Sequence, residues 1–313
     1  MPHDEKMLRR ANAFGSGSES YERYRPTYPD ELVYDVLTYA GQRAAQGVLD
    51  IGAGTGKATM LLARSGLPVT ALEPASEMGD VLRRRADEAG LGDLVTVRHG
   101  TFESLTADDG PFGLVVAAQS FHWTDPDTRW QRLVNVLAPG GTAAMFWNSW
   151  ALDDAAHDYA AIQDSYAQHG PGLIPDTGET AQHSDWPSNE LVEVLDLVDH
   201  DERSYTWSWH LPREDYLALL ATTSQYAVMP EAARGHLFNS LRPTLGSHAS
   251  LRGRTLLTLM RRASRTDTGA TPEPDWSSST GTPPRSAGHA VPPPGPAPRS
   301  AALLRLRPNR GRL

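Results

Sequence analysis

The stretch that most constrains the fold is GVLDIGAGTGKATMLLARSGLPVTALEP, which spans residues 47–74. It begins with a short apolar strand, Val48–Ile51, which a burst of glycines follows. Residues 59–65 then fit a helix, and residues 69–72 fit a second apolar strand that ends at the acidic Glu73. Two strands joined through a helix pair in parallel, with a right-handed crossover. The stretch therefore predicts the beginning of a doubly wound α/β sheet.

The same alternation of strands and helices continues to about residue 150. Helices between parallel strands cover both faces of such a sheet. The predicted fold class is therefore α/β, with a doubly wound, mostly parallel sheet. The further elements that the pattern predicts are residues 77–89 (helix), 95–97 (strand), 113–118 (strand), 126–137 (helix) and 142–147 (strand).

Beyond residue 150 the sequence becomes aromatic and rich in helix-forming residues. Two strand candidates lie in this part, at residues 203–211 and 254–262. We expect them to form an antiparallel hairpin at the edge of the sheet, which brings the sheet to seven strands. The helices between them are expected to fold over the sheet as a cap.

The end of the chain differs in composition from the rest. Residues 265–313 are so rich in proline, serine, glycine and threonine that we expect them to be disordered and dispensable for folding. The terminal LLRLRPNRGRL is basic, whereas the body of the chain is acidic. A solvated tail and an arm that contacts nucleic acid both fit that charge, and the solvated tail is favoured.

The composition and charge of the chain limit its partners. Its 313 residues carry a formal net charge of -9, which argues against a general nucleic-acid surface and favours a small-molecule partner. The absence of cysteine excludes disulfides and thiolate chemistry. The sequence shows neither the apolar core of a signal peptide nor a run long enough for a membrane span. We therefore expect a cytoplasmic protein with no membrane partner, present as a monomer or a homodimer.

The glycine loop, residues 52–56, points to a nucleotide-type ligand, because glycines let the backbone approach a ligand and the next helix presents its positive N-terminus. The dinucleotide fingerprint G-x-G-x-x-G fails because Lys57 stands where the third glycine belongs. The phosphate loop of nucleoside triphosphatases fails because Ala58 replaces the required Ser or Thr. What remains is D-x-G-x-G-x-G, with Asp50 ending one strand and Glu73 ending the next.

Further motifs extend this pattern along the chain, in the order YERYRPTYP, LDIGAGTGK, VTALEPASEM, AQSFHW, LAPGG and FWN. The set resembles the class I S-adenosylmethionine-dependent methyltransferases, and within them the bacterial small-molecule branch known as methyltransferase type 11. The resemblance covers about residues 14–262. Two positions depart from the family pattern: Asn135 lies before LAPGG, and Phe102 lies in the segment after the third strand.

The resemblance implies an enzyme that transfers a methyl group from S-adenosylmethionine to an O, N or C atom of a small molecule and leaves S-adenosylhomocysteine. It also implies a Rossmann-like methyltransferase fold with a helical cap. A non-methylating scaffold or a cofactor-binding module on the same fold is an alternative, and a dehydrogenase is a second one, weakened by Lys57. The implied segments are a helical lid (1–30), the cofactor-binding core (31–150), the cap with the strand hairpin (151–264) and the tail (265–313).

The resemblance further implies roles for particular residues. Glu73 would accept both ribose hydroxyls, and the glycine loop would lie against the methionine part of the cofactor. Met78 and Phe102 would sandwich the adenine, and the planar guanidinium of Arg25 suits a carboxylate. The cofactor-binding residues implied are Tyr24, Arg25, Asp50, Gly52, Ala53, Gly54, Thr55, Gly56, Glu73, Pro74, Met78, Thr101, Phe102, Glu103, Gln119 and Ser120.

The methyl acceptor is expected beside the SFHW segment, at the end of the fourth strand. There, His122 could accept a proton from the acceptor, or it could only orient the cofactor and pack the cleft. The histidines and acidic residues lack the spacing of metal ligands, so we expect no metal. The residues expected to line the acceptor pocket are Tyr21, Phe121, Trp123 and Trp147, with Tyr24 as an alternative to Tyr21.

Overall fold

The computed structural model describes residues 17–173, 190 and 194–264. The predicted disorder of residues 265–313 and the first part of the predicted lid segment lie outside the described residues. Within these described ranges, no helix combines the length and the apolar character that crossing a bilayer requires.

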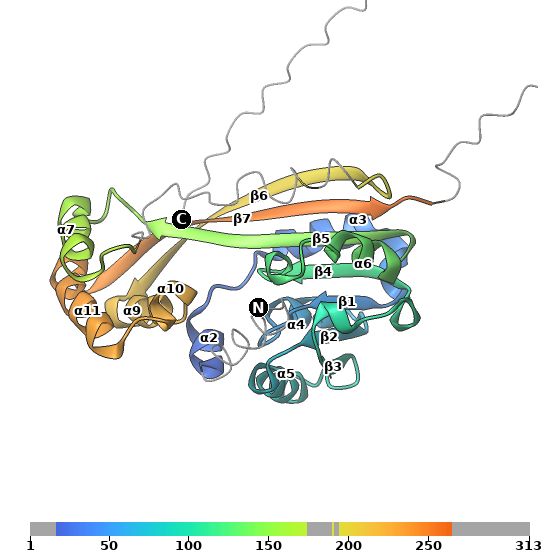
Figure 1. The fold of residues 1–313 in the computed structure, drawn as a ribbon, viewed down its shortest axis with the longest axis horizontal. Helices are drawn as coiled ribbons and strands as arrows, with labels where there is room; N and C mark the ends of the chain where they lie inside the picture. The colour runs from blue at the N-terminus through green and yellow to red at the C-terminus, as the bar shows by residue number, and fades with distance from the viewer. Residues whose placement is uncertain (1–16, 174–189, 191–193, 265–313) are drawn as a thin grey trace, which may run out of the picture. The chain divides into compact units, whose positions relative to one another are not determined.

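The described residues form one sheet with the strand order β3-β2-β1-β4-β5-β7-β6 (Figure 1). The first five of these strands run parallel, whereas β7 runs antiparallel to both β5 and β6. The predicted doubly wound, mostly parallel, seven-stranded sheet and its edge hairpin are therefore confirmed. The strands are β1 (Val48–Ile51), β2 (Val69–Glu73), β3 (Val95–His99), β4 (Phe112–Ala118), β5 (Leu137–Leu152), β6 (Leu197–Pro212) and β7 (His248–Arg262).

Helices pack on both faces of the sheet because successive side chains of a strand point to opposite faces. On β4, Val115 and Ala117 join the hydrophobic core that includes α6, whereas Leu114 and Val116 join the core that includes α3 and α4. The core helices are α3 (Asp30–Ala40), α4 (Lys57–Arg64), α5 (Ser76–Glu88) and α6 (Arg129–Val136). Short 3-10 turns are η1 (Gly41–Gln46), η2 (Phe102–Ser104), η3 (Ala107–Asp109) and η4 (Phe121–Trp123).

The last three strands are much longer than predicted, and their far ends carry the cap (Figure 1). Leu152 at the end of β5 and Leu251 on β7 pack into a buried cluster with the cap helices, around Tyr166 and Tyr226. Because β5 is parallel to β4, the cap lies beyond the C-terminal edge of the parallel strands. The cap helices are α7 (Tyr159–His169), α9 (Arg213–Ala221), α10 (Ser224–Ala227) and α11 (Glu231–Leu245).

The predicted helix at residues 126–137 is shorter in the structure, where α6 covers Arg129–Val136. Leu137 already belongs to β5 and pairs with Phe112 of β4. The Pro-Gly-Gly segment that follows is unsuited to helix, and Gly140 has a φ of 70°. The strand therefore begins before this segment and continues after a shift in register.

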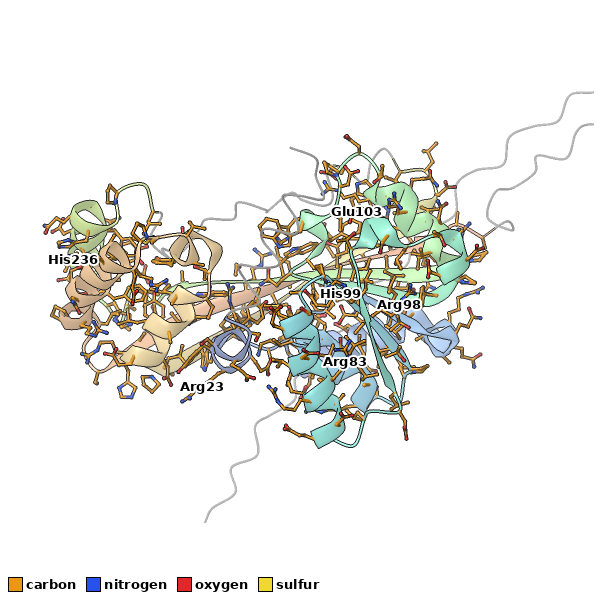
Figure 2. The ribbon with its side chains drawn as sticks, turned by 60° about the horizontal axis from the view of Figure 1, so that its bottom comes forward. Arg23, Arg83, Arg98, His99, Glu103 and His236 are labelled. Atoms are coloured by element: carbon orange, nitrogen blue, oxygen red, sulfur yellow. The ribbon has the colours of Figure 1, made fainter. Side chains whose placement is uncertain are left out.

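A further short helix, α2 (Ser18–Tyr24), lies between the sheet domain and the cap. It contacts both α5 of the core and α9 of the cap. Figure 2 shows it, with Arg23 labelled, between the cap helices and α5, which carries Arg83. α2 therefore connects the sheet domain to the cap.

Gly56 performs the close-packing role that the dinucleotide fingerprint assigns to a later glycine. It precedes α4 with a φ of 85°, and a Cβ atom placed there would lie 2.1 Å from Cδ1 of Leu82 on α5. Leu82 is fully buried and therefore has little room to move. Close approach of α5 to the end of the glycine loop thus requires a glycine.

Gly56→Ala is expected to lower the free energy of unfolding by about 1–3 kcal/mol through overpacking, in addition to the cost of the left-handed backbone. Urea denaturation of the purified variant measures the loss. Gly66→Ala is the matched control, because Gly66 has a similar φ of 82° but no atom within 4 Å of its would-be Cβ. Equal losses in the two variants would contradict the packing argument.

Candidate active site

A cavity of about 290 Å³ lies at the C-terminal edge of the parallel strands, where such sheets bind their ligands. Its wall contains the glycine loop after β1, the ends of β2 and β4, and the turn after β3. The wall is completed by Tyr21 on α2, by Arg25 directly after α2, and by Thr223 in the cap. The predicted site residues that line it are Tyr21, Arg25, Gly52, Gly54, Glu73, Pro74, Met78, Thr101, Phe102, Glu103, Gln119, Ser120, His122 and Trp123.

Glu73 ends β2 and presents a nearly buried carboxylate to this cavity. Its Oε2 accepts a hydrogen bond from the backbone N–H of Gly54 at 2.7 Å, and its Oε1 accepts one from Ala75 at 2.8 Å. Burial raises the pKa of Glu73, although both backbone hydrogen bonds act to lower it. Glu73 therefore fixes the glycine loop, and each of its oxygens retains acceptor capacity for a ligand.

Asp50 lies beneath the glycine loop and does not reach the cavity wall. Its Oδ2 accepts a hydrogen bond from Oγ1 of Thr59 at 2.6 Å, whereas its Oδ1 has no hydrogen-bond partner among the described residues. The pKa of Asp50 is raised to about 7: burial is the main cause and the nearby Glu73 contributes to the rise, whereas the hydrogen bond from Thr59 opposes it. Asp50 therefore does not contact a ligand in the cavity. It acts indirectly, by its hydrogen bond with Thr59 beneath the glycine loop.

The raised pKa of Asp50 predicts how stability changes with pH. Between the unfolded value of 3.8 and the folded value of about 7, the folded protein binds more protons at this group than the unfolded chain does. The free energy of unfolding therefore falls as pH rises through this window. Asp50→Asn removes the titration, so its stability relative to wild type should rise by on the order of 2 kcal/mol between pH 5 and 7.5.

Urea denaturation of the ligand-free protein at the two pH values measures this change. The exposed Asp93→Asn is the matched control, for which we expect no comparable pH-dependent difference from wild type. A constant stability difference between Asp50→Asn and wild type at both pH values would show that Asp50 titrates like an ordinary aspartate.

Met78 on α5 and the turn residues Thr101, Phe102 and Glu103 line the cavity beside Glu73, because β2 and β3 are neighbours and end together. Both Met78 and Phe102 are largely buried, so they pack in the core and also present part of their surface to the cavity. Glu103, labelled in Figure 2, accepts a hydrogen bond from the backbone N–H of Asp125 at 2.8 Å. This bond ties the turn after β3 to the segment that follows η4.

The floor of the cavity is formed where β1 and β4 end side by side. Gln119 has an unusual φ of 59°, and its Nε2 donates a hydrogen bond to the carbonyl of Asn148 at 2.9 Å. The hydroxyl of Ser120 donates to the carbonyl of Ile51. A Cβ atom at Gly52 would lie only 2.7 Å from Cβ of Ser120. The two strand ends therefore meet without space for a side chain on the loop.

His122 lies in η4 and contacts the indole of Trp147 on the neighbouring β5. Nε1 of Trp147 donates a long hydrogen bond of 3.4 Å to Nδ1 of His122. An indole N–H can only donate, so this contact favours the neutral tautomer in which Nδ1 is the acceptor and the proton is on Nε2. In this tautomer Nε2 is a hydrogen-bond donor and cannot accept a proton.

Two residues expected to line the acceptor pocket lie elsewhere. Phe121 is fully buried and packs against Phe102 and Trp130, with ring centroids 6.0 and 5.0 Å apart. Trp147 belongs to the same core, and its Nε1 contacts His122, which lines the cavity. The tight turn of η4 sends Phe121 inward while His122 and Trp123 face the cavity. The placement of Phe121 and Trp147 in the pocket wall is therefore corrected.

Other predicted residues lie near the cavity but not in its wall. Tyr24 packs against the cap cluster, and Gly56 supports the contact with Leu82. Ala53 and Thr55 line a small adjoining pocket, which also contains Lys57. The described residues contain no group of three or more His, Cys, Asp or Glu side chains suited to a metal, and the expectation of no metal stays a prediction.

Residues from distant elements also reach the site, although no sequence motif predicts them. Thr222 and Thr223 come from the cap. In the sequence, Lys57 is only a mismatch to the dinucleotide fingerprint, and Glu22 lies inside YERYRPTYP without a predicted role. The position of Glu22 within that motif was the one available signal for it.

Comparisons with known proteins agree with this geometry. Residues 48–141 match the family model of a methyltransferase domain. The chain is 32% identical over 240 residues to uncharacterized methyltransferases of Mycobacterium bovis and Mycobacterium tuberculosis, across 76% of this chain and 88% of each relative. A glycine/sarcosine/dimethylglycine N-methyltransferase of Actinopolyspora halophila is 37% identical over 111 residues, across 34% of this chain and 19% of that protein. A solved structure described as a type II methyltransferase of Anaeromyxobacter dehalogenans shares the fold, with 20% identity, a TM-score of 0.55 and coverage of 77% of this chain and 99% of that one.

The chain belongs to the class I S-adenosylmethionine-dependent methyltransferases, and it is a methylating enzyme whose cofactor is S-adenosylmethionine. The cavity fits this cofactor. A nearly buried carboxylate, Glu73, lies at one side of it, and the glycine loop presents backbone without side chains. Met78 and Phe102 add apolar surface on the side of Glu73.

Proposed function

We propose that this enzyme methylates a small molecule at an oxygen, nitrogen or carbon nucleophile. The observation that carries the proposal is the wall that Tyr21, Arg25 and Thr223 add on the side of the cap. A polymer would need an open groove at this place, whereas a small molecule can enter a walled cavity of about 290 Å³. The net charge of -9 also disfavours nucleic acid as the acceptor. The Actinopolyspora relative is named for glycine, sarcosine and dimethylglycine, which are small molecules.

In this proposal, Glu73 accepts the ribose hydroxyls and the glycine loop lies along the methionine part of the cofactor. Support comes from the positions of the Glu73 oxygens, which already accept from Gly54 and Ala75 and retain further acceptor capacity. Met78 and Phe102 hold the adenine between them, and Arg25 binds the methionine carboxylate. Asp50 acts indirectly, beneath the loop.

The acceptor is proposed to lie in the part of the cavity that η4 lines, beside His122 and Trp123. S-adenosylmethionine supplies a methyl group that its positively charged sulfur has already activated. The protein must therefore mainly align the acceptor and exclude water. Since Trp147 favours the tautomer with the proton on Nε2, we propose that His122 orients the acceptor by donating a hydrogen bond, rather than acting as a base. Trp123 supplies aromatic surface around the acceptor, whereas Tyr21 packs against Met78 on the cofactor side of the cavity.

Incubation with methyl-labelled S-adenosylmethionine and a bacterial metabolite extract tests the proposal. The expected result is label in the small-molecule fraction, in a compound whose mass has increased by one methyl group. The same incubation with protein and nucleic-acid fractions is the control. Label confined to a macromolecular fraction would contradict a small-molecule acceptor while leaving the methyltransferase assignment intact.

A further inference from the structure

The helix α2 is bonded both to the cofactor-binding core and to the cap. Its contacts with α5 and α9 place it between the two parts (Figure 2). Glu22 on α2 faces the core, and Arg25 directly after α2 faces the cap. Glu19 of α2 also pairs with Arg84 of α5, on the exposed surface. Of the two acidic residues, Glu22 is the one that is bonded to the glycine loop.

The carboxylate of Glu22 is held by three residues of the core. Oγ1 of Thr55, in the glycine loop, donates to Oε2 at 2.6 Å. Nη2 of Arg85, on α5, lies 2.9 Å from Oε1. Nζ of Lys57, the first residue of α4, donates to the Glu22 carbonyl at 2.8 Å and lies 3.5 Å from Oε2. Glu22 thus joins α2 to the loop and to the helices on either side of it.

Charge makes this carboxylate hard to replace. It lies between two cations whose side chains are 13% exposed at Lys57 and 25% exposed at Arg85. Burial is the main cause that lowers the pKa of Lys57, and Arg85 lowers it further, whereas Glu22 raises it. Without the negative charge of Glu22, the two cations would repel each other in a poorly solvated place. The loop or α2 would then have to move.

The loop is therefore fixed from two sides. On the side of the sheet, Glu73 accepts the N–H of Gly54. On the side of α2, Glu22 accepts the hydroxyl of Thr55, and Nη1 of Arg85 donates to the Thr55 carbonyl at 2.6 Å. Of these bonds, the one between Thr55 and Glu22 involves α2 directly.

The same helix carries part of the cavity wall. Nε and Nη2 of Arg25 donate to Oγ1 and to the carbonyl of Thr222 in the cap, at 2.8 and 2.9 Å. Tyr21 packs against Met78 and Ala75. Tyr21 and Arg25 both line the cavity, so any movement of α2 opens or closes its wall.

We propose that Glu22 is a positioning residue that fastens α2 to the glycine loop and thereby slows release of the cofactor. The bound cofactor lies between α2 and the loop, so the bonds of Glu22 must break before this side of the cavity opens. The inference rests on the cofactor site and is independent of the identity of the methyl acceptor.

Binding of S-adenosylhomocysteine to the full chain tests this, by calorimetry for the affinity and stopped flow for the dissociation rate. Glu22→Gln keeps the size of the side chain and removes its charge. We expect affinity to fall by about tenfold, within the usual range of coupling between two sites, with most of the change in the dissociation rate. Hydrogen exchange should also show that ligand protects the α2 amides less in the variant than in wild type.

Glu19→Gln is the matched control, because Glu19 lies on the same helix but pairs with Arg84 on the exposed surface. Its affinity and dissociation rate should equal those of wild type. An unchanged dissociation rate in a folded Glu22→Gln variant would overturn the proposal. An equal increase in both variants would also overturn it, because the effect would then reflect general loosening of α2.

Thr55→Val provides a second variant, which removes one hydrogen bond to Glu22 and leaves the ion pairs in place. We expect a faster release of S-adenosylhomocysteine than in wild type, by a smaller factor than in Glu22→Gln. If Glu22→Gln does not fold, this variant decides the question: a wild-type dissociation rate in Thr55→Val would then refute the role of the bond. In the double variant, the effects of the two changes should be less than additive.

Discussion

Glu73→Ala is expected to weaken binding of S-adenosylhomocysteine by roughly 1.5 to 3 kcal/mol, the usual range for hydrogen bonds to a charged group. Two losses combine in this variant. The proposed bonds to the ribose hydroxyls disappear, and the N–H groups of Gly54 and Ala75 lose the acceptor that orders the loop. Calorimetric titration of the folded variant measures the change.

Glu73→Gln separates charge from shape and is expected to bind nearly as weakly as Glu73→Ala. An amide has one oxygen and one NH₂ group, so one of the two backbone N–H groups would face a donor instead of an acceptor. Glu77→Gln, in the first turn of α5, is the matched control and should bind like wild type. Wild-type affinity in both Glu73 variants would remove Glu73 from the cofactor site.

The core of the fold could be predicted because its signals are local. β1 has the predicted bounds, Val48–Ile51, and α5 (Ser76–Glu88) differs from the prediction by one residue at each end. Apolar periodicity and glycines determine such elements over a few residues. The lengths of β5, β6 and β7 could not be predicted in the same way. Their outer halves are strands because they pair with one another and pack against the cap.

In the candidate site, too, residues in local motifs could be predicted, whereas residues placed by long-range contacts could not. Residues in continuous motifs, such as Glu73, Met78 and His122, line the cavity because the carboxyl ends of parallel strands meet at one edge. The burial of the Phe121 side chain could not be predicted. It depends on the 3-10 turn η4, in which one of the aromatic side chains points into the core. Glu22 could not be assigned because its partners, Thr55 and Arg85, come from other elements.

The hydrogen bond from Trp147 favours His122 as a hydrogen-bond donor rather than a base. With Nδ1 of His122 as the acceptor of the Trp147 N–H, the neutral ring can donate from Nε2 but cannot accept a proton there. A base would need the opposite tautomer. Glutamine reaches about as far as histidine and also ends in an N–H donor, but it is no base at neutral pH. Substitution by alanine and by glutamine therefore distinguishes the two roles.

His122→Ala is expected to lower turnover about 100-fold, the loss that misplacement of the acceptor can cause, while affinity for S-adenosylhomocysteine changes little. His122→Gln should retain turnover within about tenfold of wild type, because it restores the donor that orients the acceptor. Turnover with the acceptor found by labelling, measured at saturating cofactor, checks both. If His122→Gln is as slow as His122→Ala, His122 is a general base, since that role accounts for losses of the same size. If both variants keep wild-type turnover, His122 only packs the cleft, and alignment of the acceptor by other residues of the cavity, such as Trp123, is the main source of catalysis.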